Sequence, residues 1–230
     1  GSGCLENLKA ECERLGISRA LIITGRTLSE EGTLLRKVQD GLGGRCAGVF
    51  SRTHQHVPRS TVIEAARAAR EVEADLLISF GGGTPNDTAK LAALCLAENA
   101  AGEDELDRLR IRFTYPDQVE IPPVTGECIP HIAISTTLSA GEFTNFAGAT
   151  DEDRKVKDLY TGPGLWASSA FLDPEVTTLT PGWLWASTGI RAVDHAIETV
   201  CSKHTVPIAD AVALEALRLL FQHLPPSAAD

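Results

Sequence analysis

The stretch from Ala74 to Glu98 constrains the fold most strongly, because it predicts a strand, a glycine turn and a helix in direct succession. The apolar run from Leu76 to Phe80 is typical of a buried strand. Three glycines follow in GGGTPNDTAK, and they permit a turn that a β-carbon would forbid. The residues after them are rich in Ala, Leu and Lys, which favour a helix.

The start of that helix predicts an anion site. Thr84 can cap the helix, Pro85 suits its first position, and Asp87 completes a capping-box pattern three residues after the cap. The free N–H groups and the positive end of the helix dipole would then favour a bound phosphate. The alternative is a well-capped structural turn, since a glycine triplet alone is weak evidence.

Strands and helices alternate along the first 180 residues. Apolar runs predict further strands at residues 20–24, 46–50, 132–135 and 168–173. Helical patterns cover residues 5–15, 28–41, 61–74 and, within a charged segment, 104–112. This alternation over short connections predicts an α/β fold with a Rossmann-like parallel sheet, to which we assign residues 4–180.

Near Pro181 the pattern changes to helices only, at residues 183–202 and 208–224. Two helices are too few to close a core of their own. We therefore assign residues 181–230 to the start of an all-helical second domain.

Charge and cysteine usage narrow the classes of partner. The 230 residues are 43% hydrophobic, which is enough for a sizeable core, and their formal net charge of −10 argues against a nucleic-acid backbone or an anionic membrane as partner. Six scattered cysteines without CxxC spacing predict reduced thiols. No apolar run reaches the length of a membrane span and no signal-peptide pattern is present, so a cytoplasmic location is expected.

Small hydroxyl residues follow the predicted strand at 132–135. Thr136, Thr137 and Ser139 stand beside Gly141, at the carboxyl end of that strand. In open α/β sheets ligands bind outside the carboxyl ends of the strands, so these hydroxyls are placed to contact a ligand. The alternative is an ordinary polar turn.

Several separated motifs together resemble one family. GGGTPNDTAK resembles the GGGSxxDxAK nucleotide signature of the iron-containing alcohol dehydrogenase superfamily, and ISTTLSAGEFT resembles its threonine-rich strand and turn. Arg154 to Lys157 resembles its basic segment, and FLDPEVTTLTP its Asp-Pro element. TGIRAVDHAIETVCS and PIADAVALEALRLL resemble the first two helices of its C-terminal domain. The short turn TTLSAGEFT is most similar to the maleylacetate reductase branch.

The resemblance implies hydride transfer between NAD(P)H and a small substrate, in a cleft between the dinucleotide domain and a helical domain. It places the cofactor pyrophosphate at Gly81, Gly82, Gly83 and Thr84, with Asp87 close to the cofactor. It also implies that Thr136, Thr137 and Ser139 line the nucleotide crevice and that Lys157 approaches the ribose. For these last residues a solvent-facing role is the alternative.

The turn after the first predicted strand departs from the family pattern. Metal-dependent members often carry an acidic residue there, near the adenosine end of the cofactor, whereas this chain has Gly25 and Arg26. An acid would repel a 2′-phosphate, and a guanidinium can pair with it. We therefore expect NADPH to be accepted at least as well as NADH.

A second departure lies in the predicted helix GIRAVDHAIE. Members that use iron or zinc place an Asp and a His four residues apart on this helix, and here those positions hold Arg191 and His195. Arginine cannot ligate a cation, so no metal is expected. Arg191 would suit a carboxylate of an anionic substrate, with His195 as proton donor or orienting group. The alternative is an ion pair of Arg191 with Glu198 or Asp194.

The resemblance also implies a longer protein. Family members begin with a strand hairpin ahead of the position of Leu5 and continue well beyond residue 230, so a fragment of this kind can bind dinucleotide without turning over substrate. The predicted function is an NAD(P)H-dependent reductase of a small dicarboxylate, similar to maleylacetate reductase, and the family implies a homodimer. The alternatives are a metal-dependent alcohol or polyol dehydrogenase and a non-catalytic nucleotide-binding or oligomerisation module.

Overall fold

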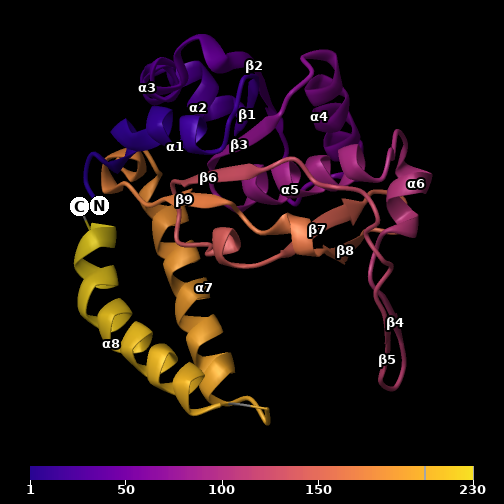
Figure 1. Ribbon diagram of the computed structural model, residues 1–230. Coiled ribbons are helices and arrows are strands. Elements are labelled where there is room, and N and C mark those ends of the chain that lie inside the picture. Colours follow the sequence, from indigo (N-terminus) through magenta and orange to yellow (C-terminus); the bar gives the residue numbers. More distant parts are fainter. Residues whose placement is uncertain (205, 230) are drawn as a thin grey trace.

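Five parallel strands form the centre of the computed structural model, which describes residues 1–204 and 206–229 (Figure 1). The sheet order is β2-β1-β3-β6-β9. Its strands are β1 (Ala20–Gly25), β2 (Cys46–Thr53), β3 (Leu76–Gly81), β6 (His131–Ser135) and β9 (Ser169–Phe171). All five strands fall within or beside the predicted apolar runs, and the predicted α/β fold with a parallel sheet is confirmed.

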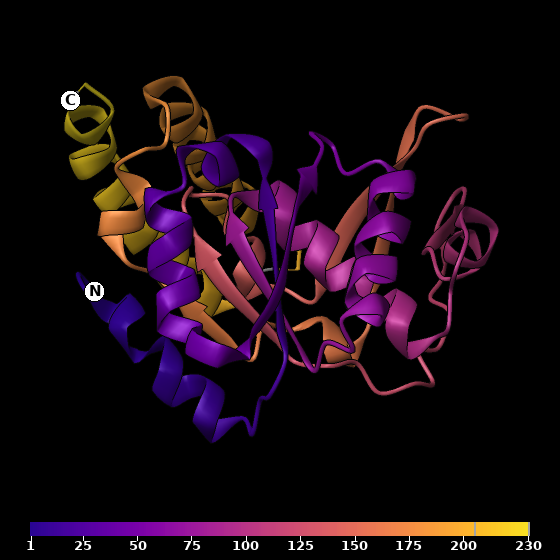
Figure 2. The same cartoon turned by 90° about the horizontal axis from the view of Figure 1, so that it is seen from above.

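Helices cover both faces of this sheet (Figure 2), which is why its central strands are apolar on both sides. One face packs under α1 (Leu8–Arg14), α2 (Arg26–Glu31) and α3 (Thr33–Leu42). The other packs under α4 (Arg59–Glu71) and α5 (Gly83–Ala97). Successive residues of β3 face opposite sides of the sheet. Leu76 and Ile78 pack in the apolar cluster under α1 to α3, and Leu77 packs in the cluster under α4 and α5.

The helix predicted over residues 28–41 is wrong as a single element. Gly32 adopts a left-handed conformation, with φ of 76°, and separates α2 from α3. A residue with φ in this range ends a helix readily when it is glycine, because there is no β-carbon to clash with the backbone.

Two antiparallel ribbons were not predicted. β4 (Arg112–Thr114) and β5 (Gln118–Glu120) follow α6 (Glu103–Arg108) and project from the body of the molecule (Figure 1). β7 (Phe146–Asp151) and β8 (Val156–Thr161) form the second ribbon, which packs against α5. Short 3-10 helices lie at Cys4–Asn7, Gly43–Arg45, Gly141–Phe143, Pro163–Leu165 and Pro174–Thr177.

The last part of the described chain is a pair of long helices, as predicted. α7 (Gly182–Val200) and α8 (Pro207–Ala229) pack against each other beneath the sheet (Figure 1). α8 extends past the predicted end at residue 224, through Pro225 and Pro226. The assigned second domain also includes Thr205 and Asp230, which lie outside the described residues. None of the described helices combines the length and apolar character that crossing a membrane requires.

Candidate functional site

The turn between β3 and α5 is built by glycine. Gly81 has a φ of 142° and Gly82 is the N-cap of α5, so the helix begins at Gly83 and no side chain caps its first turn. The prediction of Thr84 as cap, with Asp87 closing a capping box, is therefore wrong. The two glycines complete the turn early, which leaves Thr84 and Pro85 inside the first helical turn. The uncapped N-terminus keeps the N–H groups and dipole that favour an anion.

This turn packs closely against the segment after β6. The N–H of Thr136 donates to the carbonyl of Gly81 at 3.0 Å. A β-carbon on Gly82 would approach Thr137 Oγ1 to 2.9 Å, and one on Gly83 would approach Ser139 Oγ to 3.4 Å. The structure thus brings together two groups of predicted site residues, and Gly82 is required for their approach.

Asp87 and Lys157 meet where α5 packs against the β7–β8 ribbon. Asp87 Oδ2 accepts from the N–H of Gly148 at 3.2 Å and from Lys157 Nζ at 3.4 Å. Burial raises the pKa of the Asp87 carboxyl, and the nearby Lys157 ammonium acts in the opposite direction. A β-carbon at Gly148 would overlap Lys157 Cε, so a larger residue at 148 would displace the end of the lysine side chain.

Lys90 is a structural residue of the site that sequence reasoning did not single out. Its side chain is fully buried, and Nζ donates to the carbonyls of Gly141, Thr144 and Phe146 at 2.6, 2.5 and 3.2 Å. Burial lowers the pKa of this ammonium. Lys90 ends the motif GGGTPNDTAK, and a lysine directly before the apolar run LAALCLA was the signal. It anchors the loop after Ser139 to α5.

Gly25 and Arg26 lie at the same edge of the sheet, because β1 pairs with β3 in parallel. Gly25 ends β1 in an extended conformation, and Arg26 is the first residue of α2. The Arg26 side chain is exposed, and its Nε lies 3.6 Å from Glu30 Oε1. A phosphate has to compete only with a solvent-screened ion pair for this guanidinium.

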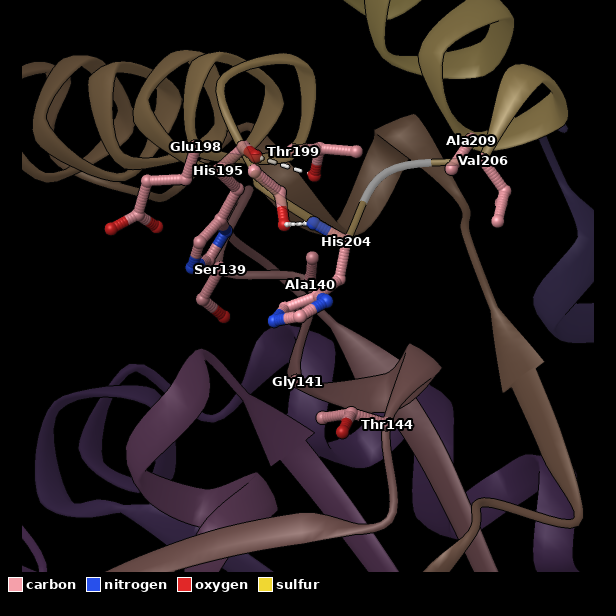
Figure 3. A pocket seen from close by; sticks show the side chains of 11 residues that line it. Ser139, Ala140, Gly141, Thr144, His195, Glu198, Thr199, His204, Val206 and Ala209 are labelled. Carbon is pink, nitrogen blue, oxygen red and sulfur yellow. Dashed lines mark hydrogen bonds between the residues drawn. The ribbon is translucent and has the colours of Figure 1, made fainter. Parts of the chain in front are cut away.

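A cleft of about 630 Å³ lies between the loop after β6 and the end of α7 (Figure 3). Figure 3 shows the imidazole of His195 beside Ser139 and that of His204 between Ala140 and Thr144. His195 and Ser139 were predicted site residues. The remaining lining residues were not: Ala140, Gly141, Thr144, Glu198, Thr199, Ser202, His204, Val206 and Ala209.

Arg191 lies next to the cleft without lining it. Its Nη1 contacts Asp194 Oδ2 and lies 3.3 Å from Glu198 Oε2. The Arg191 side chain is about half exposed. Arg191 therefore forms the ion pairs with Asp194 and Glu198 that were the alternative to a substrate-binding role.

The acidic groups of the described chain do not offer an open metal site. Among the described residues, Asp107, Asp151 and Asp158 form the one group close enough to share a cation. Arg59 already fills that position, with guanidinium nitrogens 2.7 to 2.9 Å from all three carboxylates. Hydrogen bonds from the backbone and side chain of Arg154 lower the pKa of Asp151 to about 2. On α7, Arg191 and His195 stand at the positions where the resemblance implies a metal pair, and a guanidinium has no lone pair to offer a cation.

Comparisons with known proteins agree with this architecture. The family described as iron-containing alcohol dehydrogenase matches residues 1–174. Dehydrogenase FUM7 of Gibberella moniliformis is 35% identical over 204 residues, which are 86% of this chain and 46% of that protein. Maleylacetate reductase 2 of Cupriavidus pinatubonensis is 30% identical over 227 residues, which are 98% of this chain and 53% of that protein.

A solved structure extends the comparison to three dimensions. Sulfoacetaldehyde reductase from Bifidobacterium kashiwanohense in complex with NAD+ matches with a TM-score of 0.86 at 26% identity, over 100% of this chain and 58% of that chain. The chain thus spans about half the length of the relatives it matches. The predicted resemblance to this superfamily and to maleylacetate reductases is confirmed. The chain belongs to the iron-containing alcohol dehydrogenase family.

Proposed function

We propose that the chain forms the cofactor-binding part, and one wall of the substrate cleft, of an NAD(P)H-dependent reductase for a small dicarboxylate-type substrate. The observation that carries the proposal is the position of Ser139. This residue lies against the uncapped start of α5 through Gly83 and also lines the cleft that contains His195. A cofactor on the glycine turn and a substrate in the cleft would therefore be neighbours.

The residues have distinct roles in this proposal. The backbone N–H groups of Gly82 to Thr84 donate hydrogen bonds to the pyrophosphate at the positive end of α5. Thr136, Thr137 and Ser139 line the crevice beside them, and Lys157 with Asp87 contacts the ribose side. When bound, the nicotinamide supplies the hydride. His195 orients the reacting group of the substrate and donates a proton to it.

The donor chemistry of α7 favours a reaction without a metal at this position. By the resemblance, Arg191 stands where family members that use a metal carry an aspartate. Its guanidinium would repel a cation beside His195. Arg26 at the end of β1 supports acceptance of NADPH, because its exposed guanidinium can pair with a 2′-phosphate. A homodimer and a cytoplasmic location remain predictions from the resemblance.

Calorimetric titration of NADPH and NADH into the chain tests the proposal. We expect both to bind, and we expect Gly82→Ala to abolish binding, because the new β-carbon meets Thr137. Gly44→Ala is the matched control, since nothing lies within 4 Å of a β-carbon there.

Arg26→Ala should weaken the binding of NADPH about tenfold and leave the binding of NADH unchanged. Arg67→Ala, which removes a similar exposed pair with Glu71, should change neither. If neither dinucleotide binds the unmodified chain, the proposed function is wrong.

A further inference from the structure

The cleft contains a negative charge whose partner lies just outside it. Glu198 lines the cleft one turn after His195 on α7. Its carboxylate lies 3.3 Å from Arg191 Nη1. A guanidinium at this distance offsets part of the field that Glu198 would present to an incoming anion, since the same guanidinium also contacts Asp194. Arg191 can therefore influence an acidic substrate without touching it.

A second imidazole enters the cleft from the connection between α7 and α8. Figure 3 shows the imidazole of His204 between Ala140 and Thr144, on the far side of the cleft from Glu198. The backbone N–H of His204 donates to Ser202 Oγ at 3.1 Å, which holds the start of this connection. An imidazole offers at least one N–H donor in either protonation state. His195 and His204 therefore place two donors over one cavity.

We propose that the cleft selects substrates with an acidic group, with His204 as a direct contact and Arg191 acting through Glu198. The inference rests on the proposed reduction of a small anionic substrate and adds the residues that recognise its acid. Hydrogen bonds to an ionised acceptor are roughly twice as strong as neutral ones, so His204 has the larger effect. Arg191 is a positioning residue with a smaller effect, because the Arg191 and Glu198 side chains are 51% and 63% exposed and are screened by water and salt.

Maleate is the probe, since it is a small dicarboxylate, and neutral maleamide is the control ligand. Each is titrated calorimetrically into the chain at low ionic strength, with and without NADPH. We expect maleate to bind about tenfold or more tightly than maleamide. His204→Ala should weaken the binding of maleate about tenfold. His223→Ala removes an exposed imidazole of α8 outside the cleft and should have no effect.

The role of Arg191 is separated by a double substitution. Arg191→Ala should weaken the binding of maleate about threefold at low salt and less at high salt, because the charge of the Glu198 carboxylate is left without its partner. Adding Glu198→Gln should restore the affinity. If Arg191 touched the acid directly, Glu198→Gln would not restore it. A failed rescue, an unchanged affinity in His204→Ala, or no maleate binding at all would each overturn the inference.

The same titrations distinguish this inference from the proposed function. NADPH binding without maleate binding overturns the acid-selective cleft and leaves the cofactor site in place. Maleate binding without binding of either dinucleotide supports the acid-selective cleft and overturns the reductase proposal.

Discussion

The α/β unit and the α7–α8 pair carry similar apolar side chains and bury them to different degrees. Phe80 in β3 is fully buried, because helices cover both faces of the sheet. Phe221 in α8 is 67% exposed and Trp183 in α7 is 70% exposed. The two helices pack against each other so closely that a β-carbon at Gly189 would overlap Leu224. An apolar pattern thus predicts which face of an element is apolar, and burial requires a second surface to cover it.

The largest effect in this comparison is expected from two matched phenylalanines. Phe80→Ala should lower the free energy of unfolding by about 4 kcal/mol, because it leaves a cavity between the sheet and α1 to α3. Phe221→Ala should change it by less than about 0.5 kcal/mol, because this ring is largely in water already. Urea unfolding followed by circular dichroism measures both values. Equal losses would show that α8 is covered in solution, and the comparison would fail.

Two matched arginines should give the next largest difference. Arg59 is 4% exposed and holds α4, α6 and the β7–β8 ribbon together through three aspartates. Arg59→Met should cost about 3 kcal/mol, because it leaves buried carboxylates without their partner.

Arg218 of α8 is the control for Arg59. It pairs with Glu215 at 2.7 Å while both side chains are more than half exposed. Arg218→Met should therefore cost less than about 0.5 kcal/mol in the same unfolding experiment. A loss from Arg59→Met as small as that of the control would show that Arg154 and Arg110 suffice for the three aspartates.

A smaller effect is expected from pH. His131 is buried in the middle of the sheet, where its Nε2 shares a hydrogen bond of 2.8 Å with Ser79 Oγ, and burial lowers its pKa to about 3. The unfolded chain takes up a proton on this histidine below about pH 6.5, and the folded chain does so only near pH 3. Stability therefore falls as pH drops through this window, by about 2 kcal/mol between pH 7.5 and 5.

The pH effect is measured by the unfolding of His131→Gln at several pH values. This variant should lose the His131 contribution to the slope between pH 7.5 and 5. His223→Gln, on the exposed side of α8, should keep the slope of the unmodified chain. An unchanged slope in His131→Gln would mean that this imidazole is hydrated in the folded protein.

The sheet was predictable because its strands are short apolar runs whose burial on both faces leaves little ambiguity. The two ribbons were not, since their residues alternate weakly and their positions depend on distant partners. The β7–β8 ribbon, for example, lies against α5 through Asp87 and Gly148. The break at Gly32 was also missed, because one glycine within an amphipathic pattern does not by itself reveal a left-handed φ.

The arrangement of the candidate site was also predictable only where it depends on neighbouring residues in the chain. The glycine turn is a local feature, and so its position could be read from the residues. The cap at Thr84 was mistaken because the backbone of Gly82 had already started the helix. The anchoring role of Lys90 and the position of His204 depend on contacts across 50 or more residues, such as Lys90 with Gly141 and the cleft shared by His204 with Ser139.

The three carbonyl bonds of Lys90 have a consequence for how ligands affect one another. They join the helix that begins at the glycine turn to the loop that forms the floor of the cleft. An event that orders one of these segments lowers the entropy that the other must lose. We therefore expect cooperative binding of dinucleotide and substrate, and reciprocity requires that each ligand tighten the other by the same factor.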